Sequence, residues 1–206
     1  MSANSHTSSK IERADAAARC LGLFRAEEFV QAGFPHEYIR RLLERGAIHQ
    51  VSRGLYASDS FEGDQNQSLV EAAKRFPRGV VCLMSALRFH EIGTQSPFQV
   101  WLALPSDVSP PRTAEELTIR FCKFSTATHS FGVESHDLPG GRIRVYTPAK
   151  TIADCFKYRN KFGVEVAVEA MKDGWKQRKF TLADLVEAAT VCRVRKVVKP
   201  YLEMLA

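Results

Sequence analysis

The chain has 206 residues, of which 45% are hydrophobic and 25% charged, and its formal net charge at pH 7 is +6. This composition excludes a disordered chain and allows a sizeable core, in one large domain or in a small domain joined to a medium one. No run of about 18 apolar residues exists, so we expect no membrane-spanning helix. The N-terminal stretch MSANSHTSSK is polar and lacks the apolar core of a secretory signal, which predicts a cytoplasmic protein.

The five cysteines lie far apart, without a CxxC pair or a cluster of histidine with cysteine. This usage is typical of buried thiols in a reducing cell, because a zinc site or a disulfide framework needs closer or paired spacing. We therefore expect no metal and no cofactor.

The first sixty residues predict a small domain of short elements. We expect a polar, disordered tail over residues 1–10 and a DNA-binding domain over residues 11–60. Gly33 and Gly46 are expected to end two of its helices. The expected elements are a helix at 11–22, an extended segment at 23–25, helices at 26–33 and 35–46, and strands at 47–52 and 55–58.

The helix expected at 35–46 has two different faces. Its apolar residues recur at spacings of three and four, which predicts a stripe packed on the core. The opposite face carries charged residues, and the two following strands meet at Arg53-Gly54, where a hairpin turn needs a residue tolerant of positive φ. The stripe consists of Tyr38, Ile39, Leu42 and Leu43, and the charged face of Glu37, Arg40, Arg41 and Glu44, with His36 and Arg45 at its margins.

This order of helix, strand, two helices and two strands is the layout of a winged helix-turn-helix. After a polar linker near residues 59–66, the pattern predicts a larger α+β domain over residues 61–206, with a mainly antiparallel sheet followed by C-terminal helices. In the second of those helices Val164, Val168, Met171 and Trp175 form an apolar stripe. The elements expected are helices at 68–76 and 85–93, strands near 79–83, 98–105, 117–124, 131–138 and 142–147, and helices at 149–161, 164–175, 181–193 and 196–205.

The search for a catalytic site finds only weak candidates. Glu134 and His136 share one face of a strand, but Asp137 points the other way. A nuclease that uses paired acids and a lysine would need an E-x-K or Q-x-K pattern, and only residues 177–179 fit it, without an acidic partner. Cys155 has the helical spacing of a core residue, and no phosphate-binding glycine loop occurs. We therefore expect no enzyme.

Four stretches, in this order, resemble the AbiEi antitoxins of type IV toxin-antitoxin systems. They are GLFRAEEFVQAGFPHEYIRRLLERGAIHQVSRGLYAS, CLMSALRFHEIG, VWLALP and RVYTPAKTIADCFKYRNKFGVEVAVEAM. The resemblance implies a two-domain bacterial protein. Its winged domain binds inverted repeats of double-stranded DNA in its own promoter and represses the operon. Its C-terminal domain counteracts a nucleotidyltransferase toxin without a stable complex.

In a winged domain the second helix of the motif enters the major groove, which is about 12 Å wide, and the hairpin contacts the backbone or the minor groove. The charged residues of this helix and hairpin either contact DNA or form a solvated face. Arg53 at the wing tip is the strongest candidate, because nothing beside Gly54 is available for it to pack on. The full set of candidates is Arg40, Arg41, Arg53, His36, Arg45, His49 and Gly54.

The positive charge is concentrated in the C-terminal half of the chain. Asp154 is the only acid between Arg142 and Lys161, and we expect it to pair with Lys150, Lys157 or Arg142. The basic residues predict a surface that widens the DNA footprint or faces an acidic or RNA-bound partner, or else one that is only solvated. A nuclease-like enzyme that uses this half is the alternative function. The surface comprises Arg142, Arg144, Lys150, Lys157, Arg159 and Lys161.

Overall fold

The structure, a computed structural model, describes residues 3–110 and 119–203. Residues 117–118 of one expected strand and 204–205 of the last expected helix lie outside this range. The contacts divide the chain into an N-terminal unit, residues 1–77 with 137–142, and a C-terminal unit, residues 78–136 with 143–206. Within the described residues, no helix is long and apolar enough to cross a membrane.

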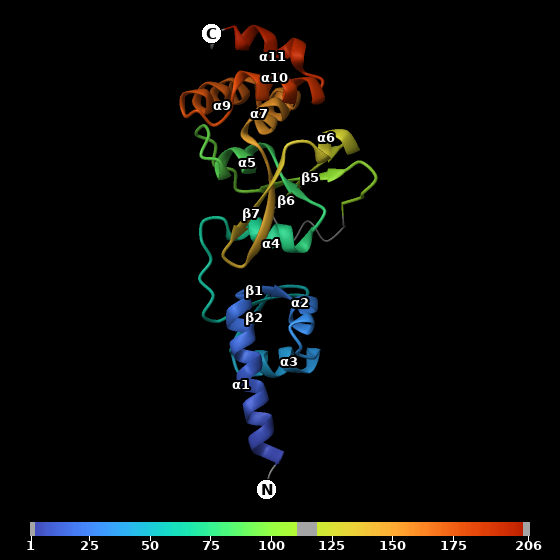
Figure 1. Cartoon of the computed structure of the whole chain (residues 1–206), viewed down its shortest axis with the longest axis vertical. Helices are drawn as coiled ribbons and strands as arrows, with labels where there is room; N and C mark the ends of the chain where they lie inside the picture. The colour runs from blue at the N-terminus through green and yellow to red at the C-terminus, as the bar shows by residue number, and fades with distance from the viewer. Residues whose placement is uncertain (1–2, 111–118, 204–206) are drawn as a thin grey trace. The chain divides into compact units, whose positions relative to one another are not determined.

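The N-terminal unit contains short helices and a three-stranded antiparallel sheet (Figure 1). Strand β3 is central in this sheet, and it pairs with β1 on one side and β2 on the other. This arrangement confirms the winged helix-turn-helix predicted from the sequence. The elements are α1 Ala3–Leu21, β1 Leu23–Arg25, α2 Ala26–Gln31, α3 His36–Glu44, β2 Ile48–Ser52, β3 Leu55–Ser58 and α4 Gln67–Arg75.

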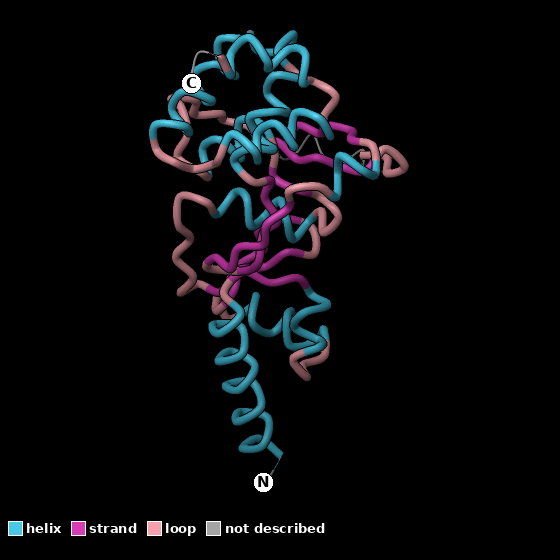
Figure 2. Tube along the Cα trace, turned by 45° about the horizontal axis from the view of Figure 1, so that its top comes forward, coloured by secondary structure: helices cyan, strands magenta, loops and turns pink. Residues whose placement is uncertain are grey.

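Helix α1 begins at Ala3, within the ten residues for which the sequence predicts a disordered tail. Its first turns extend beyond the other elements of its unit in both views (Figures 1 and 2). Further along α1, the buried residues Ile11, Ala14 and Ala18 follow helical spacing and face the core. The later turns of the helix thus bury apolar surface against the core of the unit.

Glycine ends α3 by the mechanism expected from the sequence. Gly46 has a φ of +67°, and its N–H donates to the carbonyl of Leu43 at 3.0 Å. The next N–H, that of Ala47, donates to the carbonyl of Leu42 at 3.0 Å. This Schellman motif satisfies carbonyls that have no partner inside the helix, and the left-handed conformation costs least for glycine. The chain can therefore turn directly from α3 into the hairpin.

The C-terminal unit is an α+β structure whose five-stranded sheet has the order β6-β5-β4-β8-β7. Strand β4 pairs with β5 antiparallel and with β8 parallel, and β5 pairs with β6 parallel. The sheet is therefore mixed, and the prediction of a mainly antiparallel sheet was wrong. Alternation along the chain locates strands but does not identify their partners. The strands are β4 Val80–Val81, β5 Val100–Pro105, β6 Ile119–Phe124, β7 Val133–Leu138 and β8 Gly141–Tyr146.

Helices of this unit pack around α7, and together with one face of the sheet they enclose a single large core. The predicted helix at 149–161 is divided in two after Lys157, and the short helix α6 was not predicted from the sequence. The helices are α5 Leu83–Phe89, α6 Thr126–Ser130, α7 Pro148–Lys157, α8 Arg159–Phe162, α9 Val164–Lys176, α10 Leu182–Val191 and α11 Arg195–Leu202.

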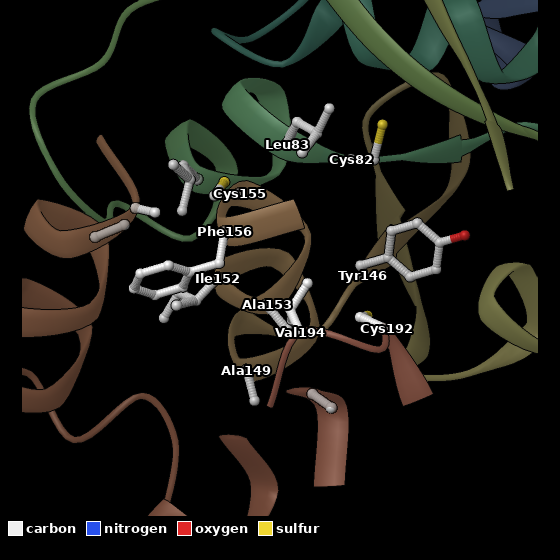
Figure 3. Close-up of a cluster of buried hydrophobic side chains, with 14 of the residues drawn as sticks. Cys82, Leu83, Tyr146, Ala149, Ile152, Ala153, Cys155, Phe156, Cys192 and Val194 are labelled. Atoms are coloured by element: carbon white, nitrogen blue, oxygen red, sulfur yellow. The ribbon is translucent and has the colours of Figure 1, made fainter. Parts of the chain in front are cut away.

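Helix α7 is the centre of this core, since every residue from Ala149 to Phe156 is buried. Figure 3 shows its side chains below Leu83 of α5 and to the left of Tyr146 of β8, with Cys192 beneath Tyr146. Cys155 is fully buried among them, which confirms its prediction as a core residue. A helix buried on all sides needs apolar residues throughout, and the polar residues that α7 does contain must therefore find partners.

Candidate nucleic-acid interface

Helix α3 presents one apolar and one charged face, as its spacing predicts. Ile39 is 4% exposed and Leu42 is fully buried, so this stripe fixes the helix against the unit's core. Tyr38 and Leu43 are half-buried at the edges of the stripe. The arginines project from the other side of the helix, where solvent or a ligand can reach them.

Both arginines on the charged face of α3 pair with an acid four residues away. The guanidinium of Arg41 lies 2.5 Å from the carboxylate of Glu37 and over the Tyr38 ring, 5.6 Å from its centroid. Arg40 is more weakly held, because its Nε lies 3.6 Å from Glu44 and its side chain is 74% exposed. Exposed pairs of this kind contribute only about 0.3–0.5 kcal/mol, so a phosphate or a base can displace the acid.

The wing tip carries an exposed cation of the predicted set, Arg53. Gly54 has a φ of +73°, and a Cβ at this position would meet nothing within 4 Å. Backbone geometry, rather than a close neighbour, therefore accounts for the glycine. Arg53 beside it is exposed, and within the described residues its side chain makes no hydrogen bond or ion pair. Its charge is free to meet a phosphate.

The remaining candidates of this unit lie around these arginines in the sequence. His36 is the first residue of α3, Arg45 caps the end of that helix, and His49 lies on the edge strand β2; all three are exposed. Arg25, in contrast, donates to the carbonyl of Lys74 at 3.2 Å and pairs with Glu27, so it serves the packing of the unit. DNA contact by the predicted residues stays a prediction.

The basic residues predicted to form one C-terminal surface lie in different places. Arg142 is in the β7–β8 hairpin, where its Nε donates to Asp137 at 2.7 Å, and Arg144 follows it on β8. Lys157, Arg159 and Lys161 gather at the end of α7 and on α8. Of these, Arg159 donates to the carbonyl of Phe156 at 3.0 Å. These residues thus lie on several elements, and their role as one surface stays a prediction.

The prediction was wrong for Lys150, which is fully buried. Its ammonium pairs with Asp154 and lies over two aromatic rings, 4.2 Å from the centroid of Tyr146 and 4.6 Å from that of Phe124. Asp154 is also fully buried, and its second oxygen accepts from the thiol of Cys192 at 3.2 Å. The expected pairing of Asp154 with Lys150 is confirmed, but the pair belongs to the core.

Burial is the main cause of the pKa shifts of Asp154 and Cys192. It raises the pKa of Asp154, while the Lys150 ammonium opposes that shift. It also raises the pKa of Cys192 to about 12, so this thiol stays protonated and unreactive near neutral pH. Among the five cysteines only Cys20 is exposed. Asp154 is thus held between Lys150 and Cys192 inside the core.

The weak catalytic candidates acquire only ordinary partners. His136 lies 3.6 Å from Glu134, and Asp137 turns the other way to bind Arg142, as the strand pattern predicts. Lys179 lines a cavity of about 330 Å³ together with Glu134 and Glu187. Within the part of the chain that is described, no group of three or more His, Cys, Asp or Glu side chains is placed to hold a metal ion.

One feature of the C-terminal unit was missed from the sequence. Trp175, expected in the core, is half-buried and lines a separate cavity of about 540 Å³ with Phe180 and Arg178. The usable signal was the short run KQRK between Trp175 and Phe180, since cations beside aromatic side chains are typical of nucleic-acid sites.

Comparison with known proteins agrees with the fold. Residues 12–58 match the family model described as "Transcriptional regulator, AbiEi antitoxin". No curated protein matches the chain. Among solved structures, the RV2827C protein from Mycobacterium tuberculosis is similar at 14% identity, with a TM-score of 0.53 over 84% of this chain and 71% of that one. At this identity the likeness shows the fold alone. Residues 12–58, which form the winged helix-turn-helix, are thus similar to the AbiEi antitoxin family of transcriptional regulators.

Proposed function

We propose that the protein is a transcriptional repressor that binds double-stranded DNA in its own promoter, and that it acts as the antitoxin of a type IV toxin-antitoxin system. The observation that carries the proposal is the N-terminal winged unit, in which α3 exposes Arg40 and the wing tip exposes Arg53 without a partner among the described residues. The family match over residues 12–58 supports both roles.

In this proposal α3 enters the major groove and the β2–β3 wing follows the phosphate backbone. Arg40 reads a base edge or a phosphate, because a guanidinium can form two parallel hydrogen bonds with guanine. Arg53 contacts phosphate, with His36, Arg45 and His49 as further contacts. Arg41 joins them once Glu37 releases it, since that surface pair is weak.

The C-terminal unit counteracts a nucleotidyltransferase toxin encoded beside this protein, and does so without a stable complex. The support for this part is the match of residues 12–58 to a family model described as an antitoxin. The basic residues at the end of α7 and on α8 remain the surface proposed to serve this role. Lys150 is no longer part of that surface, because it lies in the core.

The test measures binding of the purified full chain to its own promoter duplex at several salt concentrations. Affinity should fall steeply with salt, because binding releases counterions from DNA. Arg53→Ala with Arg40→Ala should weaken binding about 100-fold, since each contact contributes about 1–3 kcal/mol, and should flatten the salt dependence. Arg195→Ala, which removes a charge from α11, is the matched control and should bind normally.

Normal promoter binding by the double variant would contradict the winged-helix interface. The same variants also separate the two roles of the protein in cells that express the neighbouring toxin gene. The double variant should lose repression and still restore growth, because the antitoxin role is assigned to the other unit. Loss of both activities together, with the fold intact, would contradict that division.

A further inference from the structure

The C-terminal unit contains a cavity of about 540 Å³ at the end of α9, which we call the Trp175 pocket. We propose that the Trp175 pocket binds one unpaired nucleotide of a single-stranded nucleic acid, with the base against the indole of Trp175 and a phosphate held by Arg178 and Lys176. This site is separate from the winged interface, and the inference does not rest on promoter binding.

The walls of the pocket suit a flat aromatic ligand. Trp175 is half-buried, Phe180 is 7% exposed, and their ring centroids are 6.0 Å apart with planes inclined at 49°. The two ring planes are therefore inclined to each other and form two walls of the pocket. The volume lies within the range of about 300–1,000 Å³ that is usual for small-ligand sites. Bases stack on such side chains in a way that tolerates any sequence, because every base has a π-face.

The charges at the rim match a phosphate. Lys176 and Arg178 are exposed, and within the described residues neither takes part in an ion pair. The only other lining residue is Thr181, whose hydroxyl already donates to Asp184 at 2.7 Å in the capping box of α10. Among the residues that the structure describes, no carboxylate lines the pocket. It therefore favours an anionic group next to an aromatic ring, which is the chemistry of a nucleotide.

The backbone holds Arg178 in a conformation that arginine does not prefer. Its φ is +57°, and its N–H donates to the carbonyl of Trp175 at 3.0 Å. The N–H of Lys179 donates to the carbonyl of Gly174 at 2.9 Å, which completes a Schellman motif at the end of α9. Glycine is the favoured residue at this position. The motif thus places Arg178 three residues after Trp175, where its side chain lines the pocket.

Helix α10 ends with an arginine that can be compared with Arg178. It ends in the same motif, with Arg193 at a φ of +60° and the N–H of Val194 donating to the carbonyl of Ala189 at 2.8 Å. Arg193 does not line the Trp175 pocket. The chain thus carries the same residue in the same backbone conformation at two helix ends, and only one of the two faces the cavity.

A single strand fits this pocket better than a duplex or an acidic peptide. In a duplex both faces of each base are stacked on neighbours, so an indole in a cavity can reach only a base that is unpaired. An acidic peptide would satisfy Lys176 and Arg178, but a nucleotide carries its ring and its phosphate in one unit and uses both features of the site.

The test follows the fluorescence of Trp175 in the full-length chain. The protein contains two tryptophans, so Trp101→Phe leaves Trp175 as the only indole. Eight-nucleotide single-stranded RNA and DNA of mixed sequence are the probes. Either strand should quench the fluorescence, with an affinity that falls as salt rises. The same sequence annealed as a duplex should not quench it.

The two helix-end arginines provide matched variants. Arg178→Gly should weaken single-strand binding about tenfold or more, as expected for one lost phosphate contact, whereas Arg193→Gly should leave it unchanged. Both variants should melt about 1–3 °C higher, because glycine relieves the left-handed strain. A raised melting temperature shows that weakened binding does not come from unfolding. Promoter binding should be normal in both variants.

Several results would overturn the proposal. These are the absence of quenching, equal effects of Arg178→Gly and Arg193→Gly, and loss of quenching in the Arg53→Ala, Arg40→Ala variant, which would assign the signal to the wing. Displacement of the strand by a short acidic peptide containing tyrosine, bound more tightly than the strand, would identify a protein partner instead. Since promoter binding is measured on the same samples, failure of this site and failure of the proposed repressor function are distinguishable.

Discussion

Two ion pairs with the same spacing along the chain have opposite surroundings. Glu37 and Arg41 in α3 are four residues apart on an exposed helix face, with side chains 55% and 37% exposed. Lys150 and Asp154 in α7 are also four residues apart, yet both are fully buried. The first pair can open and offer its arginine to a ligand. The second cannot, because each charge is the other's only ionic partner among the described residues of the core.

The difference teaches that an i, i+4 pair has no fixed role. In water the attraction between the charges is weak and is screened further by salt. In the core, removal of either partner leaves a charge without water or counterion, and this unpaired charge lowers the free energy of unfolding. The aromatic rings of Tyr146 and Phe124 compensate part of that cost for Lys150, because their faces attract a cation.

The largest expected effect is loss of the buried cation. Lys150→Ala should lower the free energy of unfolding by about 3–5 kcal/mol, because it leaves Asp154 buried and unpaired. Urea unfolding followed by circular dichroism measures the change. Lys150→Met with Asp154→Leu removes both charges and retains the volume, and it should recover most of the loss. A Lys150→Ala variant as stable as the natural chain would show that the pair is not buried in solution.

A smaller effect is expected from acid. His90 donates from Nε2 to the carbonyl of Tyr146, 2.7 Å away, and burial lowers its pKa, as it also does for His129. The neutral histidines therefore favour folding. The pKa of histidine in the unfolded chain is about 6.5. The contribution to the free energy of unfolding is fully present above that pH and is lost as pH falls through the lowered pKa values of the folded protein.

The measurement is the urea midpoint between pH 7.5 and 5. It should decrease toward the acid end, and His90→Gln, which keeps a donor for the Tyr146 carbonyl, should reduce the slope. A slope that His90→Gln does not change would assign the acid sensitivity to other groups.

The smallest effect on stability is expected in the exposed pair. Glu37→Gln should change the free energy of unfolding by no more than about 0.5 kcal/mol, because surface pairs contribute little. It should nevertheless strengthen DNA binding, since Arg41 is released and a negative charge is removed from α3. A duplex-binding assay at low salt measures this gain. If affinity fell instead, Glu37 itself would be a DNA contact, and Arg41→Ala would then serve as the decisive companion variant.

Periodicity and the placement of glycine predicted most of the elements. The spacing of Ile39 and Leu42 located α3, and the alternation on either side of Arg53-Gly54 located the wing. In α9 the prediction was less accurate. Of the predicted stripe, Met171 is buried, whereas Trp175 is only half-buried where it packs against the core. The mixed sheet was also missed, because strand partners are chosen by contacts far apart in the sequence.

The amino-acid sequence alone was enough to predict the winged unit and its candidate DNA-contacting face, since both depend on local signals: helical spacing, helix stops and a hairpin turn. The fate of each basic residue in the C-terminal half depended on packing. Lys150 became a core residue because β6, β8 and α7 meet around it, and Arg178 came to border a cavity because α9 ends against Phe180. Burial and the dielectric surroundings of a charge arise only when distant segments come together. A count of charges along the chain therefore could not distinguish the buried Lys150 from the exposed Arg178.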